Sequence, residues 1–168
     1  MDALLEHYRA MSRYNRWMND RLYAAAGELG DEPRKRPLGA FFGSLHGTLN
    51  HLLLTDRIWI SRFGACEAPR FRALSDELFS DFDRLRAERQ ATDAALSSFV
   101  ESLTPADLAR PLEYAASSGT KRHALWLALS HLFNHQTHHR GQATTLLMQL
   151  GRDPGLTDLI ALLRGDAR

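Results

Sequence analysis

Four of the chain's eight histidines lie close together in the sequence, at His131, His135, His138 and His139. Imidazole nitrogens are good ligands for zinc, nickel, iron and copper. In an α-helix each residue advances by about 100°, so His135 and His139 are expected one turn apart on the same face. Two imidazoles with this spacing can bind the same metal ion.

A helix over residues 122–150 is predicted to position these side chains. Apolar residues recur there at the i, i+3, i+4, i+7 spacing of a helix face that packs on a core. His139 falls near the middle of this stripe and His135 inside its margin, whereas His131 lies at the edge and His138 further out. A buried imidazole is stable when a metal binds one nitrogen and a hydrogen-bond acceptor faces the other. The stripe consists of Leu125, Ala128, Leu129, Leu132, Ala143, Leu146, Leu147 and Leu150.

A third ligand is predicted from another helix, which begins after the N-cap Ser44 and ends near Phe63. Because this helix is apolar on two sides, we expect it to pack between neighbours. His51 then lies in a seam between helices and completes a site of three histidines. Asp56 lies in the other apolar stripe, where it is expected to pair with an arginine or a buried amide.

Three neutral imidazoles with an open coordination position are typical of a catalytic metal site. The alternative is that the histidines form a polar helix face with one hydrogen-bonded core histidine. Competing motifs are absent from the sequence. Gln136 stands where zinc proteases of the His-Glu pattern have their glutamate, so no general base is supplied locally. The Glu-x-x-His pairs of di-iron bundles, haem-attachment motifs and nucleophile elbows are also missing.

The remaining pattern predicts an all-α fold, a four-helix bundle with a short C-terminal helix. Asn15 interrupts the apolar stripe of the first helix, and an amide bonded to water at the helix edge is favoured over one that bridges to a neighbour. A loop is expected over residues 27–43, and an extended excursion with a turn at Ser118-Gly119 is expected over residues 112–121. The predicted helices span residues 2–26, 44–63, 75–103, 122–150 and 155–163.

Composition and charge fit one domain over residues 1–168, with 44% hydrophobic residues. The net charge is +1, from 21 basic and 20 acidic residues without a basic block, which argues against nucleic acid or anionic membranes as partners. The N-terminus lacks a signal pattern and no apolar run reaches the length of a membrane span, so we expect a cytoplasmic protein. The single Cys66 cannot form an internal disulfide, and no role is assigned to it.

Two segments together resemble the DinB-like (damage-inducible protein) family of bacterial metal-binding bundles. They are Asn50–Trp59 and Asn134–Gln142, and the resemblance extends to Tyr14–Trp17 and Leu85–Arg89. It implies a four-helix bundle with up-down-down-up connections, often dimeric. It also implies a metal held by one histidine of the second long helix and two of the fourth. Matched residue by residue, these ligands fall on His51, His135 and His139.

The resemblance also implies a function, because relatives include a mycothiol-dependent isomerase and bacillithiol S-transferases in which the metal is thought to activate a thiol. We therefore expect a divalent metal, zinc or nickel with iron as a further option, that activates a thiol or water. A small-molecule substrate or a low-molecular-weight thiol is the expected partner, and a homodimer the expected assembly. Arg140 and Gln142 are expected to support the ligands or to pack in the bundle, with packing favoured.

Two alternatives remain open from the sequence. The protein could be a non-enzymatic, stress-related dimeric bundle with a structural or incidental metal. It could also be a metal-dependent hydrolase, although this requires a general base such as Asp56 to reach the site.

Overall fold

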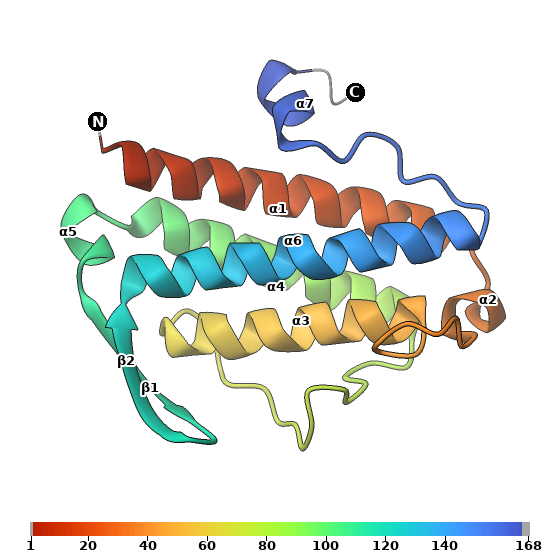
Figure 1. Cartoon of the computed structure of the whole chain (residues 1–168), viewed down its shortest axis with the longest axis horizontal. Coiled ribbons are helices and arrows are strands. Elements are labelled where there is room, and N and C mark those ends of the chain that lie inside the picture. Colours follow the sequence, from red (N-terminus) through yellow and green to blue (C-terminus); the bar gives the residue numbers. More distant parts are fainter. Residues whose placement is uncertain (1, 166–168) are drawn as a thin grey trace.

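The computed structural model describes residues 2–165 and is mostly helical (Figure 1). Its four long helices are α1 (Ala3–Gly27), α3 (Leu45–Arg62), α4 (Phe82–Ser102) and α6 (Leu125–Gln149). Three short helices are α2 (Asp31–Lys35), α5 (Pro105–Leu108) and α7 (Leu159–Arg164). A small antiparallel sheet is formed by β1 (Pro111–Ala116) and β2 (Gly119–Ala124).

The long helices lie side by side, with α1 against α4 and α6, and α3 against the same two helices. The colour gradient in Figure 1 shows that α1 and α6 run in one direction and that α3 and α4 run in the other. α3 and α6 are therefore antiparallel neighbours. The hairpin of β1 and β2 directly precedes α6, lies at the N-terminal end of that helix and contacts both α3 and α6.

Two apolar clusters form the core, one toward each end of the long helices. One gathers residues such as Leu22, Leu49 and Leu147, and the other gathers residues such as Tyr8 and Leu129. Between them all four long helices contribute buried polar side chains at the same level, which we call the ionic layer. The ionic layer consists of Asn15, Asn19, Asp56, Arg89, Asp93, Gln136 and Arg140.

Side chains that accept hydrogen bonds from the first turn fix where the long helices begin. Asp2 caps α1, and Ser44 caps α3 as predicted. The third long helix begins at Phe82 with Asp81 as its cap, so the predicted start at Ser75 was wrong. The reason is local, because the Asp76 carboxylate accepts from the backbone amides of Arg72 and Ala73 and folds this segment into a turn.

Three other boundaries also differ from the prediction. The fourth long helix begins at Leu125 rather than near Arg122, because residues 119–124 pair with residues 111–116 in the hairpin. Residues 31–35 are helical where a loop was expected, and the buried Arg34 ties this turn to α1 through the carbonyl of Ala26. The last helix begins at Leu159 and is shorter than the predicted span. The excursion over residues 112–121 does form a hairpin.

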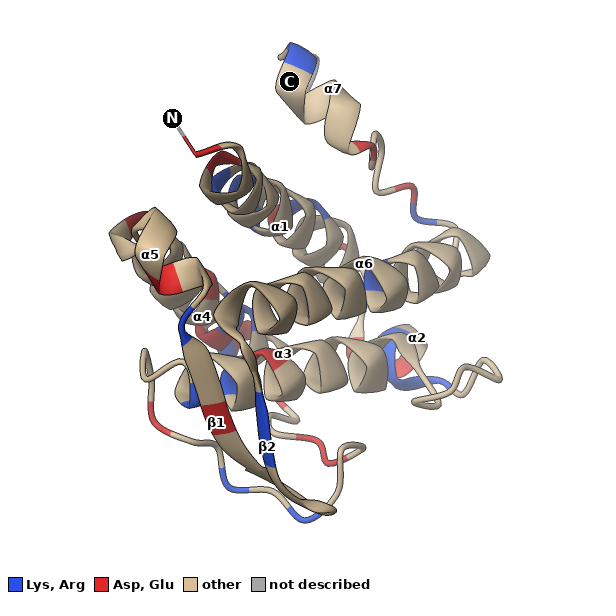
Figure 2. Cartoon of the chain, turned by 60° about the vertical axis from the view of Figure 1, so that its left-hand side comes forward, with Lys and Arg blue, Asp and Glu red and all other residues tan. Residues whose placement is uncertain are grey.

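Acidic and basic residues are spread along most of the helices, strands and loops (Figure 2). The exception is α6, in which Arg140 is the only Asp, Glu, Lys or Arg residue. None of the helices that the structure describes combines the length and apolarity needed to cross a membrane. α6 packs against α1, α3 and the hairpin.

Candidate metal centre

The structure brings the three predicted ligand residues together on α3 and α6. His51 projects from α3, and His135 and His139 project from successive turns of α6. One ligand nitrogen from each lies within 4.8 Å of the other two. We call these three residues the histidine cluster. The other two histidines of this stretch of α6, His131 and His138, are exposed and lie outside it.

Two members of the histidine cluster are oriented by hydrogen bonds to their far nitrogens. The Nδ1 atom of His51 lies 2.8 Å from the carbonyl oxygen of Leu74, and Nδ1 of His139 lies 2.8 Å from Oε1 of Gln142. These oxygens are acceptors, so each Nδ1 carries the proton and each Nε2 presents a lone pair. Gln142 therefore supports a cluster histidine, although packing was the role favoured from the sequence.

The electrostatic environment keeps the cluster uncharged. Burial lowers the pKa of His51, His135 and His139, and nearby histidines add to this effect. The effect is largest for His135, whose pKa falls to about 3 because of its burial and the surrounding imidazoles. All three side chains are then neutral at pH 7, which is the form that binds a metal.

Within the cluster, Nε2 of His51 lies 3.3 Å from Nε2 of His135. Since His51 carries its proton on Nδ1, its Nε2 offers only a lone pair at this contact. A metal ion that binds both Nε2 atoms requires the tautomer of His135 with its proton on Nδ1, and because the imidazoles are already neutral this binding releases no net proton.

Phe42 covers one side of the histidine cluster, a contact that the sequence did not reveal. Its ring stacks on His51 with centroids 3.7 Å apart and meets the edge of His139 at 5.5 Å. Gly47 makes this approach possible, because a Cβ atom there would stand 2.2 Å from the carbonyl oxygen of Phe42. The sequence signal for this contact was Gly47, in the first turn of the helix that comes shortly after Phe41 and Phe42.

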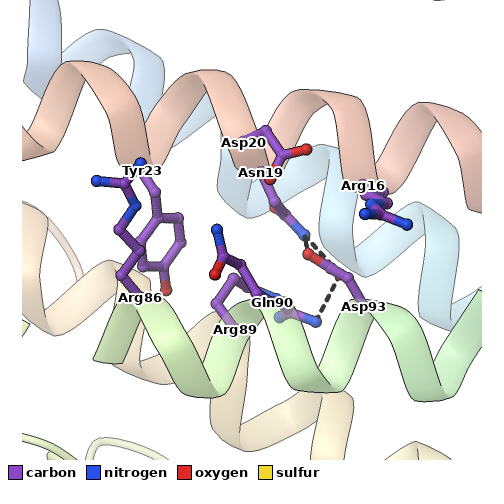
Figure 3. A pocket seen from close by; sticks show the side chains of 8 residues that line it. All are labelled: Arg16, Asn19, Asp20, Tyr23, Arg86, Arg89, Gln90 and Asp93. Atoms are coloured by element: carbon purple, nitrogen blue, oxygen red, sulfur yellow. Dashed lines mark hydrogen bonds and ion pairs between the residues drawn. The ribbon is translucent and has the colours of Figure 1, made fainter. Parts of the chain in front are cut away.

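The ionic layer is a second buried polar group, on the core side of α3 and α6, and it includes side chains from α1 and α4. Arg89 donates to Asp56 at 2.7 Å. Arg89 also donates to Asp93 at 2.8 Å, and Asn19 donates to both oxygens of Asp93 (Figure 3). Asn15 also donates to Asp93 and accepts from Arg140. Asp56 thus pairs with an arginine as predicted, whereas the prediction of a water-bonded Asn15 was wrong.

The ionic layer also corrects the predicted face of α6. Gln136 and Arg140 are 0% and 2% exposed, whereas His139 is 9% exposed. The layer therefore occupies the deepest part of this helix face, and the cluster histidines lie at its border toward α3. An open cavity of about 490 Å³ reaches the layer from the side of α1 and α4 (Figure 3). Its lining residues come from those two helices alone, so it is separate from the histidine cluster.

Comparison with known proteins supports both fold and family. A family model described as "DinB family" matches residues 3–167. Protein DinB of Bacillus subtilis (strain 168) is 29% identical over 150 residues, which cover 86% of this chain and 87% of that protein. The crystal structure of a DinB-like protein from Bacillus cereus aligns with a TM-score of 0.64 at 19% identity, over 91% of this chain and 94% of that one. At this level of identity, the structural similarity supports the fold and not a function.

Proposed function

This chain belongs to the DinB family, and from that membership we propose that His51, His135 and His139 bind one divalent metal ion that activates a thiol or a water molecule. Zinc or nickel is the proposed metal, with iron as the third option, and an S-transferase-like reaction on a small molecule is the proposed activity. The observation that carries the proposal is the convergence of three neutral imidazoles within 4.8 Å.

The donor set fits such a metal. The far nitrogens of His51 and His139 already have acceptors, so their Nε2 lone pairs are left for a ligand. When bound by three histidines with one position open, a divalent metal lowers the pKa of a bound water or thiol toward neutrality and polarises a carbonyl group. Phe42 shields one side of the imidazoles from water, which strengthens electrostatic interactions within the site.

The ionic layer bears on the hydrolase alternative. Asp56 is the carboxylate that could have served as a general base, but it is 1% exposed and paired with Arg89. No carboxylate joins the three histidines in the cluster found among the described residues. Thiol activation needs no such base once the thiol is deprotonated, so it is the reaction that these residues favour.

A second candidate function is a non-enzymatic dimeric bundle with a structural metal. The exposed apolar side chains near the C-terminus favour a homodimer, since Leu156, Ile160 and Leu163 are 48%, 52% and 55% exposed. Against a structural metal, both apolar clusters and the ionic layer hold the long helices together without the histidine cluster.

We also propose that the helices have the up-down-down-up order implied by the family resemblance. The proposed location of the protein is the cytoplasm.

The decisive experiment measures metal in untagged protein purified without added metal. Wild type is compared with His135→Ala, and His138→Ala serves as the matched control because it removes an exposed histidine of the same helix. We expect near-stoichiometric metal in wild type and the control, and its loss in His135→Ala. Metal retained by a variant with alanine at all three cluster positions, or no metal in wild type, contradicts the proposal.

A cobalt-substituted protein then separates the two candidates. Titration with 2-mercaptoethanol should produce a thiolate charge-transfer band if the metal has an open position. A cobalt spectrum that responds to neither thiol nor azide, together with a strong rise in melting temperature on metal binding, supports the structural candidate instead.

A further inference from the structure

A cavity of about 320 Å³ lies beside the histidine cluster, under the hairpin. It is bounded by α3, by both strands of the hairpin and by α6, and its size is within the range of small-molecule sites. Figure 1 shows the hairpin descending next to these two helices. The lining residues are Trp59, Tyr114, His123, Leu127, Ala128 and His131.

Flat rings form most of the wall of this cavity. The Trp59 ring lies 4.8 Å from that of His131 and 5.1 Å from that of Tyr114, which in turn lies 6.0 Å from His123. Leu127 and Ala128 supply the aliphatic part of the wall. Aromatic walls prefer a partner ring, which they contact by offset stacking or edge to face.

Arg62 packs on two of these rings and places a positive charge next to the cavity. Its guanidinium lies 4.5 Å from the Trp59 ring centroid and 4.4 Å from that of Tyr114, and it donates to the carbonyl of Ala115. Among the described residues, burial and Tyr114 act on the pKa of Arg62 and no carboxylate does, so its positive charge is not neutralised. A cationic ligand is therefore disfavoured next to it, and a neutral or anionic one is accepted.

The cavity adjoins the histidine cluster through His131. The ring of His131 lies 5.9 Å from that of His135, one turn further along α6. Since the rise over four helical residues is about 6 Å, a ligand whose ring occupies the cavity can reach the cluster with a linker of about five bonds.

From these contacts we infer that the cavity binds a neutral or anionic apolar ring of the substrate, and that the substrate's reacting thiol or oxygen then faces the histidine cluster. This inference rests on the proposed function for its reacting end. The recognition of the ring rests only on the cavity. The substrate class is therefore small ring compounds with a short linker to a thiol or oxygen, without a positive charge on the ring.

Ring recognition is tested by titrating the metal-free full-length protein with benzyl alcohol and observing amide and indole chemical shifts by NMR. Leu127→Gln is the test variant, since this exposed side chain lines the cavity without supporting the core. Trp126→Gln is the matched control, because Trp126 is a similarly exposed neighbour that does not line it. We expect benzyl alcohol to shift resonances around Trp59 and Tyr114. Its affinity should fall about tenfold in Leu127→Gln and stay unchanged in the control. Benzylamine should bind more weakly than benzyl alcohol.

The reacting end is tested on the cobalt-substituted protein with 4-phenylbutane-1-thiol and 2-mercaptoethanol. The ratio of their affinities should fall about tenfold from wild type to Leu127→Gln, and comparing the same two thiols in both proteins removes their different acidities. An unchanged ratio, or benzyl alcohol shifts located away from the cavity, overturns the inference while leaving the metal site intact. If cobalt does not bind, the proposed function fails, and the benzyl alcohol titration alone decides whether the ring cavity exists.

Discussion

The histidine cluster lies between α3 and α6 and the ionic layer joins all four long helices, and these two polar groups differ in how their polar atoms are paired. In the ionic layer, Arg89 lies between two carboxylates and donates to each of them. In the histidine cluster, the hydrogen bonds run outward to Leu74 and Gln142, and the lone pairs converge on one another. Polar groups that pair with one another fix how the helices pack, whereas convergent lone pairs require a ligand from outside the chain, such as a metal ion.

The two groups also carry charge differently. The ionic layer joins two aspartates to two arginines, and burial raises the pKa of Asp93 to about 6 and lowers that of Arg140 to about 10. The histidine cluster is neutral. Because charges are costly to bury, the layer contributes to stability only while every partner is present. The cluster can lose a histidine at little cost to the fold.

The largest effect is expected from Arg89→Met, which leaves Asp56 and Asp93 buried without their shared cation. The free energy of unfolding should fall by about 3–5 kcal/mol, measured by urea denaturation. The control is Arg57→Met, which removes a half-buried arginine paired with Glu88 and should cost about 1 kcal/mol or less. An Arg89→Met protein as stable as wild type would show that the layer does not hold the helices together.

An intermediate effect is expected from Gln142→Ala, which removes the acceptor for Nδ1 of His139. Metal affinity should fall by about 10–100-fold, because the imidazole loses its orientation and part of its basicity. Competition with a chromophoric chelator measures this. Gln142→Glu keeps an acceptor oxygen and should bind metal at least as tightly as wild type. Equal affinities in all three proteins would remove Gln142 from the site.

The smallest effect at pH 7, and the clearest difference of sign as the pH falls, is expected from the titrating groups of the metal-free protein. The pKa of His135 falls from 6.5 to about 3 on folding, so His135 contributes stability above pH 6.5 that is lost as the pH falls toward 3. The pKa of Asp93 rises from 3.8 to about 6, so protonation favours the folded state as the pH falls from 6 toward 3.8.

Two variants separate these contributions. His135→Gln should change stability at pH 7 by about 1 kcal/mol or less and should flatten the loss between pH 6.5 and pH 4. Asp93→Asn should make that loss steeper, because it removes the opposing gain. Urea midpoints at several pH values measure both. Parallel curves for the two variants would mean that neither group titrates differently in the folded and unfolded states.

The periodicity of the sequence was sufficient to find the long helices and the spacing of His135 and His139. Both are local properties, because about 3.6 residues per turn decides which side chains share a face. The seam position of His51 came from the two apolar sides of its helix. Its match with the family resemblance led to the same three residues that the structure brings together.

The partners of each polar side chain were decided only by the tertiary structure. Asn15 has a place in the ionic layer because Asp93 and Arg140 come to it from two other helices. Phe42, which covers His51, and Leu74, whose carbonyl accepts from it, both lie in loops. Helical periodicity does not predict the path of a loop. The physical reason is that helical periodicity fixes directions around one axis, while pairing between polar groups depends on the rotation and register of separate axes, which the packing of the whole core sets.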